Sequence, residues 1–297
     1  MKNQTDEIAS IHLGKKVSGS ETYNPNLIVP IPRIENRKQY QIEKNNLPFK
    51  GFDVWHAYEF SAMTTNGIPV TRLMKMKYSC ESEFLVESKS LKLYLNSFNM
   101  TRFGNTTTEC LEICKNTIEK DLSSELKTEV SVNFFDNNVE RVQIFKNFKN
   151  IMDFVDEKDL TIEKFKEAPE LLETEEKELT SYYLQFDSLR SNCRVTHQPD
   201  FGDLFLYYKS KKHILEGSLI KYLISFRKEF HFHEECCEMI YKRLTDLLDK
   251  NDELFICALY TRRGGIDISP VRTNCQAIED MMELIDLNKF ARGSIKQ

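Results

Sequence analysis

A polar segment around residue 193 carries the most reactive side chain of the sequence. Cys193 is followed by Arg194, and Asp200 comes seven residues after the thiol. A thiol beside an arginine can ionise and act as a nucleophile, and a nearby carboxyl group can donate or take a proton. The residues alone leave two interpretations open: a nucleophilic Cys193 with Asp200 as its acid–base partner, or a buried cysteine in an ordinary turn.

A second cluster, His231-Phe232-His233-Glu234-Glu235-Cys236-Cys237, combines possible metal ligands. On a helix, His233 would lie next to Cys236 or Cys237, so a zinc ligand pair is sterically possible. A complete zinc site needs two more ligands, and the sequence has no second pair with suitable spacing. The alternative is that His233 and Glu234 bind a polar heterocycle through the imidazole and the carboxylate. We therefore predict no functional metal.

Two basic segments have the residue types that bind phosphate. Glu87-Ser88-Lys89-Ser90-Leu91-Lys92 leaves a predicted strand and enters a predicted helix, whose N-terminus attracts anions. In Arg262-Arg263-Gly264-Gly265, the glycines allow close backbone approach and a guanidinium can grip phosphate. A solvated surface patch is the alternative for each segment. The sequence has no GxGxxG motif opening a βαβ unit and no Walker motif, which disfavours Rossmann and P-loop sites.

The elements that must position these residues follow from the spacing of apolar side chains. Asn66-Gly67 predicts a hairpin turn between the first two strands. We expect 141–148 to be the partner strand of 128–135. The predicted strands are 54–63, 71–86, 128–135, 141–148, 179–186, 204–208 and 254–260, and the predicted helices are 90–98, 107–122, 214–228 and 232–248.

The two halves of the chain repeat this order, first as ββααββ and then as ββααβ. Tyr94-Leu95-Asn96-Ser97-Phe98 resembles Tyr222-Leu223-Ile224-Ser225-Phe226 at an offset of 222 − 94 = 128 residues. We predict a duplicated α+β domain; the alternative is coincidence in a common helical pattern. The predicted organisation is an N-terminal arm over 1–45, a first module over 46–152, an acidic linker over 153–177 and a second module over 178–297.

Composition narrows the class of protein. The 297 residues carry 41 Lys and Arg against 46 Asp and Glu, a net charge of −5, so no overall basic field favours direct binding to nucleic acid or anionic lipid. Residues 1–25 do not resemble a secretory signal, and no apolar run approaches the roughly 20 residues that span a membrane. We expect a cytoplasmic protein that is not bound to a membrane, whose eight cysteines stay reduced.

Four segments together strongly resemble the NADPH-dependent 7-cyano-7-deazaguanine reductase family of queuosine biosynthesis, in its long two-module form. The resemblance runs from about residue 45 to residue 275. It implies two tandem tunnelling-fold (T-fold) modules related to GTP cyclohydrolase I, each an antiparallel sheet with two helices packed on one face. The segments are 87–95, Ser191-Asn192-Cys193 with His197-Gln198-Pro199-Asp200, Ser225-Phe226-Arg227 with His233-Glu234, and Tyr260-Thr261-Arg262-Arg263-Gly264-Gly265.

The resemblance also implies a chemistry and a set of site residues. Cys193 would add to the nitrile carbon of the substrate and form a covalent thioimide, with Asp200 as the proton donor. Two NADPH molecules, used in turn as co-substrates, would deliver two hydrides and leave a primary amine. Val86, Glu87, Ser88, His233 and Glu234 would bind the deazaguanine base, and Ser88, Lys89, Arg263 and Gly264 would contact NADPH.

The resemblance implies a homodimer, with a site formed between modules or between subunits. One rival interpretation is a pterin- or purine-handling enzyme like GTP cyclohydrolase I, which would need zinc and a triphosphate pocket. The absence of a Cys/His ligand set in the sequence argues against it. Another is a non-catalytic module that binds a purine or tRNA, since a fold alone does not fix function. The negative net charge disfavours tRNA.

Overall fold

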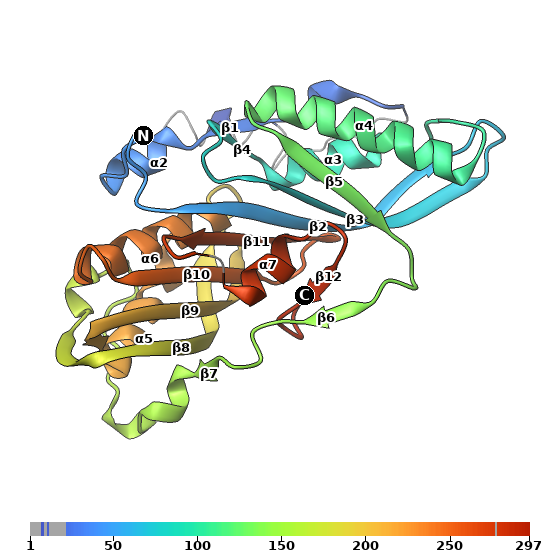
Figure 1. The fold of residues 1–297 in the computed structure, drawn as a ribbon. Coiled ribbons are helices and arrows are strands. Elements are labelled where there is room, and N and C mark those ends of the chain that lie inside the picture. Colours follow the sequence, from blue (N-terminus) through green and yellow to red (C-terminus); the bar gives the residue numbers. More distant parts are fainter. Residues whose placement is uncertain (1–6, 9–10, 12–21, 277) are drawn as a thin grey trace.

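One large sheet is the centre of the structure. The computed structural model describes residues 7–8, 11, 22–276 and 278–297. Within them, eight strands pair in the order β5-β3-β2-β11-β10-β9-β8-β7 (Figure 1), and all neighbours are antiparallel except β7 and β8. The strands are β2 (Lys50–Met63), β3 (Pro69–Ser79), β5 (Val130–Phe135), β7 (Lys149–Asn150), β8 (Thr174–Asn192), β9 (Pro199–Ile214), β10 (Glu253–Tyr260) and β11 (Ile266–Thr273).

The two halves of the chain meet where β2 pairs with β11. The pairing runs from Lys50 opposite Thr273 to Ala57 opposite Ile266. Gly51 has a φ of 152°, and a Cβ there would lie 1.9 Å from the Val271 carbonyl oxygen, so only glycine fits this approach. The sheet is therefore continuous across the predicted boundary between the modules.

Four helices cover one face of this sheet. α3 (Ser88–Asn96) and α4 (Thr107–Leu126) pack on the strands of the first half, and α5 (Glu216–Ser225) and α6 (His233–Leu247) pack on β8, β9 and β10. Apolar side chains three or four residues apart form the buried stripe of each helix. In α4 this stripe consists of Cys110, Cys114, Ile118, Leu122 and Leu126.

The C-terminal segment covers the opposite face. Ile256 belongs to the core under α5 and α6, whereas its neighbour Cys257 belongs to a core that includes α7 (Glu279–Ile285), because alternate residues of a strand point to opposite faces. After α7, β12 (Phe290–Arg292) pairs in parallel with β6 (Arg141–Gln143).

The two halves share details of side-chain bonding at the predicted offset of 128 residues. The hydroxyl of Ser97 donates to the Tyr94 carbonyl at 2.6 Å, and Ser225 donates to Tyr222 at the same distance. One turn before these tyrosines, Ser90 donates to the Glu87 carbonyl at 2.8 Å and Ser218 to the Leu215 carbonyl at 2.7 Å. These matched bonds support the predicted duplication.

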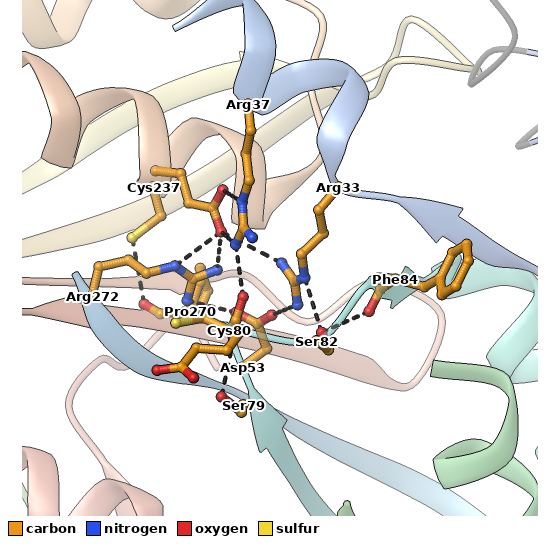
Figure 2. Close-up of polar contacts among 12 residues, drawn as sticks. Arg33, Arg37, Asp53, Ser79, Cys80, Ser82, Phe84, Cys237, Pro270 and Arg272 are labelled. Atoms are coloured by element: carbon orange, nitrogen blue, oxygen red, sulfur yellow. Dashed lines mark hydrogen bonds and ion pairs between the residues drawn. The ribbon is translucent and has the colours of Figure 1, made fainter. Parts of the chain in front are cut away.

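The described part of the predicted arm is folded onto both halves. After η1 (Pro25–Leu27), β1 (Pro30–Pro32) pairs with β4 (Phe84–Val86), and α2 (Ile34–Gln39) follows. Arg33 and Arg37 on this segment point into a buried ion-pair network (Figure 2). The remaining members are Asp53 of β2, Glu238 of α6 and Arg272 of β11.

Several predicted elements are confirmed and others are wrong. The hairpin at Asn66-Gly67 joins β2 and β3, with Gly67 at a φ of 83°. The segment 141–148 is not the partner of β5: only its first residues form a strand, and they pair with β12. The prediction over 71–86 merged β3 and β4. The prediction of a strand over 204–208 left Asp200 in the polar segment before it, whereas Asp200 lies in β9.

The predicted linker is partly structured. Its last residues, 174–177, belong to β8, and it contains all or part of the 3-10 helices η2 (Ile151–Phe154), η3 (Glu157–Asp159) and η4 (Pro169–Leu171). A further 3-10 helix, η5 (Phe226–Lys228), follows α5. Leu160 and Leu171 pack against the core under α5 and α6. All eight cysteines are free thiols, and no helix in the described ranges is both long and apolar enough to span a bilayer.

Candidate active site

A cavity of about 310 Å³ opens between the two halves of one chain. Lys89 at the start of α3 and Cys193 after β8 both line it, although they come from different halves. Every predicted site residue except Glu87 lines this cavity. The remaining lining residues were not predicted to contact the substrate or the cofactor, although Lys92 belongs to a predicted phosphate-binding segment and His231 to the run of possible metal ligands. They are Trp55, Lys92, Thr196, Gln198, His231, Phe232, Thr261, Ile266 and Ile268.

Glu87 caps α3. Its Oε1 accepts from the Lys89 backbone N–H at 2.9 Å and its Oε2 from that of Ser90 at 2.7 Å. The Glu87 N–H donates to the carbonyl of Val29 in the N-terminal segment at 3.0 Å. Burial raises the pKa of Glu87, against the effect of these N–H donors. The carboxylate therefore orders the start of α3, and its predicted contact with the base stays a prediction.

Cys193 lies in a short loop between β8 and β9. Its backbone N–H donates to the Gln198 carbonyl at 2.8 Å, and the His197 N–H donates to the Cys193 carbonyl at 3.0 Å. Because the loop closes on itself, the half-buried thiol is held at the cavity wall. The neighbouring Arg194 donates to both carboxylate oxygens of Glu235, at 3.0 and 3.1 Å.

Asp200 lies one strand residue after the start of β9, with its carboxylate almost fully buried. One oxygen forms an ion pair with the Arg263 guanidinium, and the other lies 3.4 Å from Nε2 of His233. Strand β9 is held on both sides, by β8 and by β10, so the backbone that carries the Asp200 carboxylate is fixed. The fold thus brings the predicted proton donor to the same cavity as Cys193.

His233 and Glu234 begin α6. The His233 ring stacks on Tyr260 with centroids 3.8 Å apart, and burial lowers the pKa of His233 to about 3, so its imidazole is neutral. Burial, with a contribution from Asp53, raises the pKa of Glu234 to about 8. Oε1 of Glu234 has no hydrogen-bond partner among the described residues. A buried carboxyl oxygen of this kind suits a donor on a bound ligand.

The turn between β10 and β11 carries Arg263 and Gly264. Nζ of Lys92 in α3 donates to the Gly264 carbonyl, which ties this turn to the first half. Gly265 has a φ of 81°, a left-handed backbone conformation that L side chains rarely adopt. The turn therefore favours glycine at this position.

Comparison with known proteins shows the family. The model "Nitrile reductase, 7-cyano-7-deazaguanine-reductase N-term" matches residues 20–134, and the model "QueF-like protein" matches 199–279. The NADPH-dependent 7-cyano-7-deazaguanine reductase of Colwellia psychrerythraea is 39% identical over 273 residues, covering 90% of this chain and 93% of the relative. That of Legionella pneumophila strain Lens is 39% identical over 269 residues, covering 90% and 91%.

The chain belongs to the 7-cyano-7-deazaguanine reductase family. The relatives are named as NADPH-dependent, so the side chains at the cavity can be tested against that cofactor. Lys89 and Arg263 supply positive charge for phosphates, and Ser88, the first residue of α3, lines the cavity beside Lys89. Gly264, at a φ of 57°, keeps the turn beside them free of a side chain. These residues fit a phosphate-bearing dinucleotide.

His231 is a charged cavity residue of this reductase that sequence analysis did not place at the substrate or the cofactor. Its Nε2 lies 3.2 Å from Oε2 of Glu229, and its Nδ1 lies 3.5 Å from Oε2 of Glu235. The two carboxylates outweigh burial and raise the pKa of His231 to about 9, so the ring is cationic at neutral pH. The sequence run pointed to this histidine only as a metal ligand.

The zinc alternative finds no ligand set. Among the described residues, no group of three or more His, Cys, Asp and Glu side chains is arranged to hold a metal ion. His233 stacks on Tyr260, and Cys236 and Cys237 are fully buried within α6. Independence of the reaction from metals stays a prediction for a chelation experiment.

Proposed function

We propose that this protein reduces the nitrile of 7-cyano-7-deazaguanine to the primary amine of 7-aminomethyl-7-deazaguanine with NADPH, as a step of queuosine biosynthesis. The observation that carries the proposal is the gathering of Cys193, Asp200, His233 and Glu234 around one cavity, in a chain of this family. Reduction of this nitrile needs a thiol nucleophile, a proton donor and side chains that bind the deazaguanine ring, and these residues supply all three.

Cys193 acts as the nucleophile. Its thiolate sulfur adds to the nitrile carbon, one C–N π bond breaks, and the nitrogen takes a proton from Asp200, which leaves a covalent thioimide and the Asp200 carboxylate. The short separation of His233 Nε2 from Asp200, 3.4 Å, lets the imidazole orient this carboxyl group. NADPH, when bound, supplies the hydride, and two molecules are consumed in turn for each nitrile.

Substrate recognition depends on the Glu234 carboxylate and on the residues beside it at the cavity. Glu234 accepts from the ring and amino N–H groups of the base, and its unpartnered Oε1 supports this role. His233 lies beside it in α6, and Val86, Glu87 and Ser88 approach the base from the first half. Glu87 acts chiefly through the order it gives to α3, since both of its carboxylate oxygens accept backbone N–H groups.

Ser88, Lys89, Arg263 and Gly264 bind the cofactor. Lys89 and Arg263 form ion pairs with the negatively charged phosphates, while the backbone of Ser88 and Gly264 contacts the cofactor directly. The site lies between two tandem T-fold modules of one chain. The protein acts in the cytoplasm, and it acts as a homodimer, as the family resemblance implies.

The test is turnover by the purified protein. With 7-cyano-7-deazaguanine and NADPH, we expect nicotinamide absorbance to fall and two NADPH to be oxidised for each aminomethyl product. Cys193→Ala protein provides the control for background oxidation. No oxidation by the folded wild-type protein, or oxidation without amine, would contradict the proposed function.

A further inference from the structure

Two residues with different proposed tasks are joined at the cavity. Asp200 is the proposed proton donor and Arg263 a proposed cofactor ligand, yet their side chains form an ion pair. The Asp200 side chain is 4% exposed and that of Arg263 is 39% exposed. Nη2 of Arg263 also donates to Oε1 of Gln198 at 2.9 Å. A buried carboxylate is therefore paired with a guanidinium on a long side chain that is partly exposed to solvent.

The ion pair with Arg263 disfavours the protonated form of Asp200, which is the form that a proton donor needs. A proton donor must carry a proton, whereas an adjacent guanidinium favours the ionised carboxylate. His233 does not add to this effect, because burial lowers its pKa to about 3 and leaves it neutral. The other titratable or charged side chains at this cavity are Cys193 from the loop after β8, His231 before α6, Glu234 in α6, and Lys89 and Lys92 in α3.

The backbone around Arg263 is fixed while its side chain has room. The Arg263 N–H and the Ile266 carbonyl pair at 2.8 Å, and Lys92 holds the Gly264 carbonyl. A movement of the guanidinium from Asp200 toward a ligand thus needs only side-chain rotation. Lys89 lines the same cavity, so a phosphate near Lys89 competes with Asp200 for Arg263.

We propose that Arg263 is a positioning residue for the proton donor, which links cofactor binding to the protonation of Asp200. In the cofactor-free protein, Arg263 holds Asp200 as a carboxylate. When a cofactor phosphate takes the guanidinium, Asp200 loses its cation and gains a proton more readily. This inference rests on the proposed function for the roles of both residues.

Formation of the covalent adduct without cofactor isolates this effect. The rate of adduct formation with 7-cyano-7-deazaguanine would be followed by absorbance and by intact-protein mass over a range of pH. A proton donor that must be protonated makes this rate fall at high pH. We expect Arg263→Gln to move that fall to higher pH by roughly 1 to 3 units, the range in which a neighbouring arginine affects an aspartic acid. Arg263→Lys keeps the charge and should stay close to the wild type.

Arg262→Gln is the matched control. It removes the same charge from the same turn, but Arg262 lies over the Tyr58 ring, 4.4 Å from its centroid. The control should keep the wild-type pH profile. Adding NADP⁺, which binds without donating hydride, should move the wild-type profile in the direction of Arg263→Gln and leave that variant's profile where it is.

The outcomes separate this inference from the proposed function. Wild-type protein that forms no adduct at any pH contradicts the proposed function. A wild-type protein that forms adduct, with the same pH profile in Arg263→Gln, overturns the inference alone. It is also overturned if Arg262→Gln shifts the profile equally, or if folded Arg263→Gln forms no adduct at any pH, since Arg263 would then be needed to orient Asp200.

Discussion

Arg37 and Glu238, 201 residues apart in the chain, form a buried two-point ion pair. Nε and Nη2 of Arg37 donate to the two carboxylate oxygens of Glu238 at 2.8 and 2.7 Å. Arg272 donates to the same carboxylate, and Arg33 pairs with Asp53 (Figure 2). The N-terminal segment is thereby bonded to the helix whose first turn carries His233 and Glu234.

We expect this network to dominate the stability of the junction. Glu238→Gln leaves three buried guanidinium groups with less counter-charge, so it should lower the free energy of unfolding by about 3 to 5 kcal/mol. Urea denaturation at pH 7 measures the loss. Lys44→Met, which removes the exposed pair of Lys44 with Glu83 at 3.9 Å, should leave stability unchanged within error. Equal effects of the two substitutions would contradict this role.

The same pair predicts a dependence on pH. The arginines lower the pKa of Glu238 from 4.5 to about 2. Because the folded protein holds this carboxylate ionised more strongly than the unfolded chain, the stabilisation is fully present above about pH 4.5 and is lost as pH falls toward 2. The stability difference between wild type and Glu238→Gln should therefore shrink below pH 4. A constant difference would mean that Glu238 does not titrate in this way.

Cys193→Ala should abolish the covalent adduct while leaving the fold intact. No other side chain can replace the sulfur in the thioimide, so no hydride transfer should follow. Intact-protein mass after mixing with the nitrile measures the adduct. Cys275→Ala, which removes a half-buried thiol that does not line the cavity, is the control and should form adduct normally. A full adduct on Cys193→Ala would place the nucleophile elsewhere.

Asp200→Asn should slow adduct formation and turnover by roughly 10² to 10⁴, the usual contribution of general acid catalysis. The amide keeps the shape of the side chain but has no carboxylic proton. Asp203→Asn tests a carboxylate of the same strand whose partners are Ser294 and Lys296, away from the cavity, and should keep its rate. Stopped-flow absorbance gives both rates. An unchanged rate in Asp200→Asn would assign the proton to another group.

Lys89→Ala should raise the KM for NADPH by roughly 10-fold or more and leave nitrile binding unchanged, because a charge-assisted phosphate contact is lost. Steady-state kinetics with each substrate varied in turn separates the two constants. Lys115→Ala, on the outer side of α4, removes the same charge far from the cavity and serves as control. Loss of nitrile affinity alone would show that Lys89 serves the base instead.

Glu234→Gln should weaken base binding and stabilise the free protein. Burial raises the pKa of Glu234 from 4.5 to about 8, so the folded protein retains a proton that the unfolded chain releases. Wild-type stability therefore falls as pH rises from 4.5 through 8, and this loss is absent in the variant. At pH 9 the variant should therefore be more stable than the wild type.

Titration calorimetry with the nitrile base measures the weaker binding expected of Glu234→Gln. At pH 9, above the pKa of Glu234, loss of a hydrogen bond to the ionised carboxylate should weaken binding of the nitrile base by roughly 10- to 100-fold. If Glu234→Gln bound the base as tightly as wild type, the carboxylate would not be the group that recognises it. If it were instead less stable than wild type at pH 9, the buried carboxyl would be stabilising rather than strained.

The sequence by itself identified the candidate reactive residues and determined the local elements. Cys193, Asp200, His233 and Glu234 were identifiable because each stands in a short run whose residue types are unusual together. The hairpin at Asn66-Gly67 was predictable because a turn depends on the φ values that its own residues tolerate. The repeated helices were predictable because Tyr94 and Tyr222 begin matching runs, and their bonds to Ser97 and Ser225 are local.

Only the tertiary structure decided which distant segments became partners. β11 pairs with β2 across more than 200 residues, and 141–143 pairs with 290–292 rather than with β5, because partner choice depends on the burial of whole faces and not on strand propensity. The contact of Asp200 with Arg263, and that of Arg37 with Glu238, arise for the same reason. The sequence specifies the charge and shape of each side chain, but the free energy of pairing two buried charges depends on the surroundings that the folded chain gives them.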